Sequence, residues 1–148
     1  MSDAYFDTAY IGKCYFNEPG AHHVRELARA SERIASSALC IPELGCAIHR
    51  KVREGSLSPG SALTVRQDFL DDIDAGVWLL IPVSDRILRQ AEILTRILPD
   101  TIPLRALDAI HVASAIEEGL GEIWTNDRRL LAAAAHVGMK GRRITPAG

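Results

Sequence analysis

The chain has 148 residues, a length typical of one compact domain, and 47% of them are hydrophobic, which is ordinary for a globular protein. It contains no apolar run long enough to cross a membrane, and its N-terminus, with Asp3 and no basic cluster, does not resemble a signal peptide, so we expect a cytoplasmic protein. The formal net charge of -2 excludes nucleic-acid binding through a strong overall positive charge, so any such contact must be local.

Strand and helix patterns alternate along the chain. In chain order, the sequence predicts a strand at 4–6, helices at 8–16 and around 24–34, a strand near 34–37, helices at 42–55 and 58–76, a strand at 77–83, helices at 84–98 and 104–120, a strand at 122–125, a helix at 126–137 and a short strand within 138–144. This βαβα alternation predicts a parallel sheet with helices on both faces. We therefore expect one α/β domain over residues 1–148, with three α/β/α layers.

Four acidic residues follow the predicted strands or begin the helices after them. Asp7 directly follows the first strand, Glu43 lies in the first turn of the helix after the second strand, and Asp127 follows the strand at 122–125. Asp108 lies near the start of its own helix. Since open parallel sheets bind ligands beyond the carboxyl ends of their strands, these carboxylates are candidates for one site. Each of them could instead cap a helix.

Asp108 is the hardest of the four to explain as a capping residue. It interrupts an apolar stretch, Ala106 to Ile110, so we expect it to be at least partly buried. A buried carboxylate needs a partner, and Arg105 is the one suitably spaced cation nearby. A divalent cation shared with the other acids would also satisfy the charge. An all-oxygen site favours Mg²⁺ or Mn²⁺, and such ions promote phosphodiester hydrolysis.

Four blocks of the sequence resemble the PIN-domain ribonucleases of the VapC toxin type. They are Ala4 to Tyr10 with Asn17 to Gly20, then Ser36-Ser37 with Pro42-Glu43-Leu44 and Arg50, then Leu104 to His111, and finally Thr125 to Leu131. The blocks occur in order over nearly the whole chain, and each of the four acids lies in one of them. The resemblance implies a PIN-like fold and a magnesium-dependent nuclease that cleaves RNA.

The resemblance also implies roles for particular residues and partners. Asp7, Glu43, Asp108 and Asp127 would be the catalytic, metal-binding acids, and Thr125 would be a supporting hydroxyl beside Asp127. Thr8 would either orient Asp7 or cap the helix that follows. The expected partners are an RNA substrate, a small antitoxin that blocks the acidic site, and a second copy of the chain. The apolar helical surface expected for the homodimer includes Leu63, Phe69, Leu88 and Leu94.

Several other residues receive a structural interpretation. We expect His111 to be packed or exposed rather than to act in catalysis, and Trp124 to pack in the core. The three cysteines lack metal-ligand spacing and lie among apolar residues, so we expect reduced thiols, with no disulfide and no zinc. Local cations that could contact nucleic acid are Arg50, Lys51 and Arg53, and Arg128, Arg129, Lys140, Arg142 and Arg143.

Three alternative functions remain to be weighed against a ribonuclease. A haloacid-dehalogenase-like phosphatase would use Asp7 as a nucleophile, but it needs a second Asp where this chain has Ala9. A structure-specific DNA nuclease would use similar acids. A non-catalytic binding module could retain the acids as helix caps, although all four are present.

Overall fold

The computed structural model describes residues 3–145 and contains five parallel strands. The strands are β1 (Ala4–Tyr5), β2 (Ile34–Ser37), β3 (Trp78–Ile81), β4 (Glu122–Trp124) and β5 (Lys140–Arg142). One group pairs in the order β1-β2-β3, and β4 pairs with β5. A single parallel bridge between Phe6 and Trp124 joins the two groups, and the amide of Asp7 donates to the Trp124 carbonyl at 3.1 Å. The strands therefore run in the order β3-β2-β1-β4-β5, with the junction beside β1.

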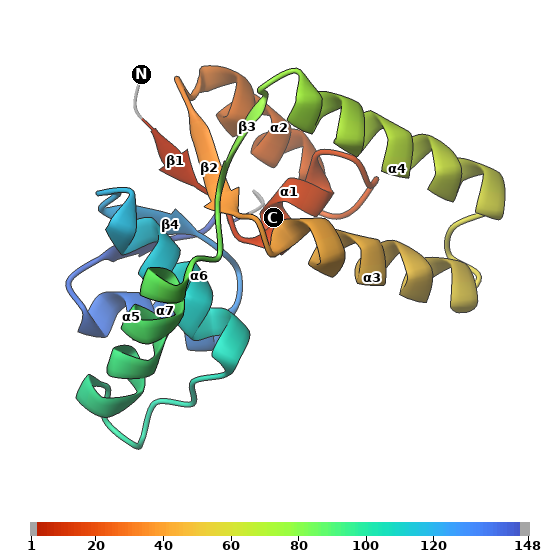
Figure 1. Cartoon of the computed structure of the whole chain (residues 1–148). Helices are drawn as coiled ribbons and strands as arrows, with labels where there is room; N and C mark the ends of the chain where they lie inside the picture. Colours follow the sequence, from red (N-terminus) through yellow and green to blue (C-terminus); the bar gives the residue numbers. More distant parts are fainter. Residues whose placement is uncertain (1–2, 146–148) are drawn as a thin grey trace.

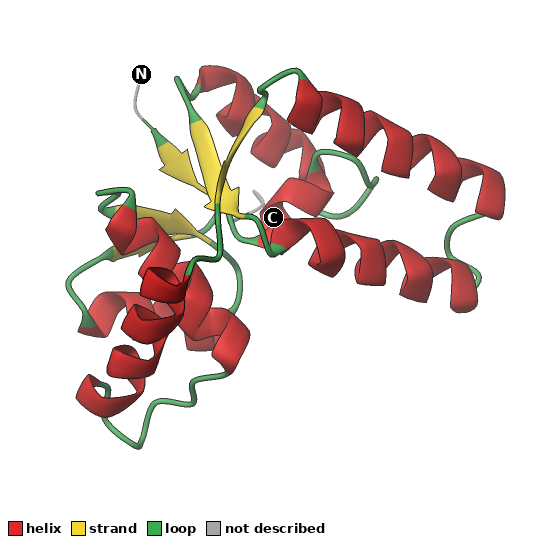
Figure 2. Cartoon of the chain, viewed as in Figure 1, coloured by secondary structure: helices red, strands yellow, loops and turns green. Residues whose placement is uncertain are grey.

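Helices cover both faces of this sheet, as the alternating pattern predicts (Figures 1 and 2). One layer contains α1 (Thr8–Lys13), α2 (Ala21–Ala30), α3 (Cys40–Arg53) and α4 (Pro59–Asp74). The other contains α5 (Asp85–Ile97), α6 (Ala106–Glu117) and α7 (Arg128–His136). Each layer buries its own hydrophobic cluster against the sheet, centred on Phe6 and Ile48 on one face and on Val112 and Ile123 on the other. The predicted three-layer α/β/α fold is confirmed.

Side-chain caps set several of the helix starts. Ser58 accepts from the amide of Ser61 and is followed by Pro59 in the first turn of α4, and Ser84 accepts from the amide of Ile87 at the start of α5. Asp7 and Asp127 cap α1 and α7 in the same way. Because Asp127 is the cap, α7 begins at Arg128 rather than at the predicted residue 126. The strand β3 ends at Ile81, short of the predicted 83, because Pro82 has no amide to donate.

The apolar residues expected on the helical surface are partly exposed and partly buried. On α4 the side chains that face the core are Ala62, Phe69 and, partly buried, Val65 and Ile73. Leu63 is 71% exposed and Leu70 is also exposed. They lie one position beyond the buried residues, which turns them about 100° around the helix. On α5, Leu94 is buried and Leu88 is exposed.

The cysteines differ in their surroundings. Within residues 3–145 all three are free thiols, as predicted. Cys40 is buried and Cys14 is partly buried, and burial raises the pKa of both thiols, to about 12 and about 11. Cys46 is exposed, so burial does not protect this thiol. None of the helices described is long and apolar enough to span a membrane.

Candidate active site

The four acids predicted from the sequence line one small cavity, although they come from different elements. Asp7 follows β1, Glu43 lies on α3, Asp108 on α6, and Asp127 follows β4. The cavity is about 220 Å³ in volume, and its other polar lining residues are Thr8, Arg105 and His111. It opens at the carboxyl ends of β1 and β4, where the two strand groups meet. This is the place that the strand-end rule indicates.

Asp7 is a buried carboxylate held at both oxygens. One oxygen accepts from the amide of Tyr10 at 2.9 Å, which is the helix-capping contact. The other accepts from the hydroxyl of Thr125 at 2.5 Å. Burial raises the pKa of Asp7, opposed by these two hydrogen bonds. Thr125 also accepts from the amide of Asp127 at 3.0 Å, so this hydroxyl links two of the acids across the junction of the sheet.

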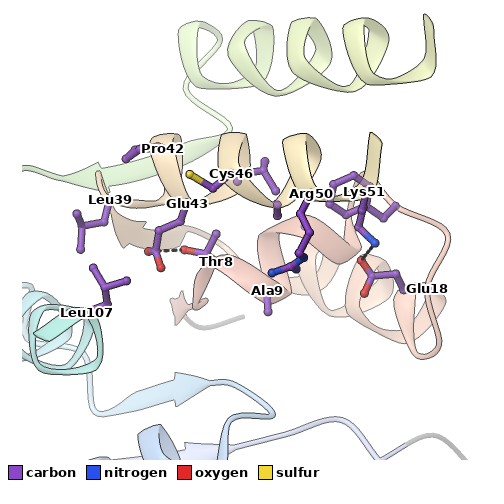
Figure 3. A pocket seen from close by; sticks show the side chains of 14 residues that line it. Thr8, Ala9, Glu18, Leu39, Pro42, Glu43, Cys46, Arg50, Lys51 and Leu107 are labelled. Carbon is purple, nitrogen blue, oxygen red and sulfur yellow. Dashed lines mark hydrogen bonds and ion pairs between the residues drawn. The ribbon is translucent and has the colours of Figure 1, made fainter. Parts of the chain in front are cut away.

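Glu43 is held by a chain of side chains that begins in the core. Its Oε1 accepts from the hydroxyl of Thr8 at 2.9 Å (Figure 3) and lies 2.9 Å from Nε2 of His111. Nδ1 of His111 lies 2.7 Å from the hydroxyl of Tyr5, which is fully buried. Burial raises the pKa of Tyr5, so its hydroxyl keeps its proton. The carboxylate of Glu43 only accepts hydrogen bonds, so Nε2 of His111 is the donor in their contact.

Burial of the Glu43 carboxyl works against its ionisation, but the hydrogen bond and charge of His111 and the hydrogen bond of Thr8 outweigh it and lower the pKa of Glu43. Glu43 is therefore an ionised acid at neutral pH. Thr8 supports Glu43, whereas the sequence suggested a contact with Asp7 or a capping role. His111 is buried, which is one of the two alternatives that the sequence left open, but it also contacts the site, which the sequence interpretation missed. Its spacing of three residues from Asp108 on α6 was the available signal, since such residues share a helix face.

Arg105 joins the other two acids. Its Nε and one terminal nitrogen donate to the two oxygens of Asp108 at 3.0 and 3.1 Å, and the same terminal nitrogen donates to Asp127 at 2.7 Å. The Asp108 side chain is only 6% exposed, whereas that of Arg105 is 55% exposed. The buried charge of Asp108 is thus compensated by a guanidinium that reaches in from the surface. The pairing with Arg105 that the sequence raised is present.

Helix capping and a role in the site do not exclude each other here, because they use different atoms. Asp127 accepts from the amides of Arg129 and Leu130 through Oδ1 and faces Arg105 through Oδ2. Asp108 accepts from the backbone amide of Arg105 at 3.3 Å and also faces the cavity. The capping interpretation is therefore correct for the backbone contacts and leaves carboxylate oxygens for another ligand.

The donor set suits a hard cation, since all four acids offer carboxylate oxygens. Among residues 3–145, however, no three His, Cys, Asp or Glu side chains are arranged so that they could hold a metal ion. The guanidinium of Arg105 lies between Asp108 and Asp127, and Glu43 is turned toward His111 and Thr8. A divalent cation held by these acids would require Arg105 to withdraw, which its exposed side chain allows.

Comparisons with known proteins agree with this fold. A family model described as PIN domain matches residues 4–136. No curated protein sequence matches the chain. Among solved structures, VapBC2 from Rickettsia felis, bound to a DNA fragment from its promoter, is similar with a TM-score of 0.67 and 16% identity, over 98% of this chain and 100% of that one.

Two further structures are similar. FitAcB from Neisseria gonorrhoeae has a TM-score of 0.64 and 17% identity, over 99% of this chain and 98% of that one. A toxin-antitoxin complex from Klebsiella pneumoniae has a TM-score of 0.59 and 18% identity, over 97% of each chain. At these identities the likeness shows a shared fold.

Proposed function

The chain belongs to the PIN domain family, whose members are generally nucleases, and on that premise we propose that it is a Mg²⁺-dependent endoribonuclease, with Mn²⁺ as a substitute. We take residues 1–148 as a single nuclease domain and the protein as the toxin of a VapBC-type pair. The observation that carries the proposal is the convergence of Asp7, Glu43, Asp108 and Asp127 on one cavity at the strand ends. Helix capping alone does not require acids from four elements to share a cavity.

In this proposal the four acids would hold a divalent cation beside the scissile phosphate. The cation would supply positive charge for that phosphate and favour deprotonation of the attacking water. Thr125 holds Asp7, and Thr8 with His111 holds Glu43, so these carboxylates keep a fixed orientation while the substrate binds. The depressed pKa of Glu43 keeps that acid ionised for this purpose at neutral pH.

The RNA substrate, the antitoxin and the compartment are part of the proposal. Similar structures are toxin-antitoxin complexes, which supports a small antitoxin that inserts into the acidic cavity. RNA is preferred to structured DNA because of the small chain and the toxin-like sequence blocks. A cytoplasmic location fits an RNA substrate.

A homodimer is also part of the proposal, but the predicted surface is only partly available. Leu63 and Leu88 are exposed, whereas Phe69 and Leu94 are buried in the cores and cannot form it. Besides Leu88, the exposed apolar side chains on α5 and α6 include Ile93, Ile97 and Ile116. Light scattering at micromolar concentration should give twice the mass of the chain, and a monomeric mass would remove this part of the proposal.

Cleavage with and without metal tests the enzymatic proposal. We expect the purified chain to cleave single-stranded RNA in Mg²⁺ or Mn²⁺ and to stop in EDTA. Asp108→Asn should abolish cleavage, whereas Asp68→Asn, an exposed acid on α4 away from the cavity, should retain it. A DNA nuclease would cleave structured DNA in preference to RNA. A binding module would cleave neither nucleic acid, and equal cleavage in EDTA would exclude the metal mechanism.

A further inference from the structure

Three cations on α3, Arg50, Lys51 and Arg53, have different surroundings. Lys51 lies 3.5 Å from Glu18 and 4.6 Å from the ring centre of Phe16, so its charge is already engaged. Arg53 is exposed and lies outside the pockets that α3 lines. Arg50 lines a pocket, and within residues 3–145 its guanidinium makes neither an ion pair nor a hydrogen bond. Of the three, Arg50 is available for a ligand.

The pocket lined by Arg50 adjoins the acidic cavity. It has a volume of about 570 Å³, within the usual range for ligand sites, and it shares Thr8, Glu43 and Leu107 with that cavity. Figure 3 shows Glu43 at one end with Leu39 and Leu107. Arg50 lies further along and extends from α3 toward Ala9 on α1, and Lys51 and Glu18 lie beyond it. The two spaces therefore form one path that begins at the carboxylates.

Helix geometry sets the distance between Glu43 and Arg50 along α3. Glu43 and Arg50 are seven residues apart on α3, so they share a face and are separated by about 10 Å along the helix axis. The Arg50 side chain extends toward Ala9 rather than toward Glu43, so it is not directed at a phosphate held beside the acids (Figure 3). A cation in this position can instead bind the phosphate of a neighbouring nucleotide, and the apolar lining between the two residues, which includes Ala9 and Ala47, can contact its base or ribose.

We propose that this pocket binds the nucleotide next to the scissile phosphate of a single-stranded RNA, with Arg50 contacting that nucleotide's own phosphate. The inference rests on the proposed function, since it takes the acidic cavity as the place of the scissile phosphate. RNA is favoured over an antitoxin segment because the guanidinium of Arg50, which makes no ion pair or hydrogen bond within residues 3–145, suits the oxygens of a phosphate. The proposed contact with Arg50 also explains how a chain of net charge -2 can hold nucleic acid, because the positive charge is local.

Binding of a short single-stranded RNA at several salt concentrations tests the proposal, with Asp7→Asn as a common background that prevents cleavage. Each phosphate contact to a single strand contributes about 0.7 to the slope of log Kd against log salt. Arg50→Gln should lower that slope by about 0.7 and weaken binding about fivefold near 0.1 M salt. Arg53→Gln, one turn further along α3, should change neither quantity. Circular dichroism and thermal melts should be equal for the two variants.

An Arg50→Gln slope equal to that of Arg53→Gln would overturn the proposal, even if the parent chain cleaves RNA. The same conclusion follows if Arg50→Gln leaves RNA binding unchanged but weakens binding of an acidic antitoxin peptide, because the pocket then receives the antitoxin. Absence of cleavage by the parent chain would instead remove the proposed function itself. The binding and cleavage measurements therefore distinguish the two failures.

Discussion

Replacement of Arg105 by Gln should make the protein bind divalent cations more tightly. The guanidinium of Arg105 uses both oxygens of Asp108 and one oxygen of Asp127, and these are oxygens that the proposed metal site needs. Arg105 and the metal therefore compete. Gln removes the positive charge and the two-pronged contact but keeps a polar side chain at the same exposed position.

The size of the effect follows from the charges involved. Two unit charges 4 Å apart repel by about 1 kcal/mol in bulk water and by about 4 kcal/mol at an effective dielectric of ~20, and a divalent cation doubles both values. Because the Arg105 side chain is 55% exposed, the solvent-screened end of this range applies. About 2 kcal/mol corresponds to a Kd that is roughly thirtyfold lower.

Isothermal titration calorimetry with Mn²⁺ and Mg²⁺ measures this change directly. The matched control is Arg89→Gln on α5, which removes an exposed arginine paired with Asp85 and should leave metal affinity unchanged. Thermal melts give an independent check. In EDTA, Arg105→Gln should melt below the parent, since the buried carboxyl of Asp108 loses its guanidinium partner, and Mn²⁺ should raise its melting temperature more than that of the parent. Equal or weaker metal binding by Arg105→Gln would refute the competition.

Two further substitutions test the buried acid Asp7 and the histidine that holds Glu43. Asp7→Asn should abolish cleavage, yet in EDTA it should stabilise the fold. Burial raises the pKa of Asp7 in the folded state above its unfolded value. The parent therefore loses stability as pH rises from about 4 until the folded pKa is passed. Melts that show no greater advantage for Asp7→Asn at pH 7 than at pH 4 would contradict this. His111→Gln should lower cleavage and Mn²⁺ affinity by about 10- to 100-fold, since it removes the donor that fixes Glu43. An intact fold by circular dichroism with unchanged Mn²⁺ affinity would show that His111 only fills the core.

The positions of the acids could be predicted from the sequence, because each depends on local signals. Asp7 ends an apolar strand and caps the next helix, and these two features are visible within a few residues. The partners of the acids could not be predicted in the same way. Thr8 and its contact Glu43 are 35 residues apart in the sequence, and Tyr5 and its contact His111 are 106 residues apart. Both contacts depend on how α3 and α6 pack against the sheet.

The exposure of Leu63 shows another limit of the sequence. Spacing of apolar residues predicts that one face of α4 is buried, but not how wide that face is. The neighbour that α4 packs on most is α3, and Ala62 and Phe69 are the residues buried there. A narrow contact leaves Leu63 and Leu70 outside, although they are as apolar as the residues that are buried.

The single bridge between Phe6 and Trp124 joins two parts of the site that come from early and late segments of the chain. Asp7 and Glu43 lie on the side of β1, whereas Thr125 and Asp127 follow β4, more than 75 residues later in the order of synthesis. A ribosome that makes this protein therefore completes Asp7 and Glu43 long before their later partners, Thr125 and His111, exist. If these carboxylates carry the nuclease activity, a nascent chain is harmless to the ribosome and messenger that produce it until its last strands have formed.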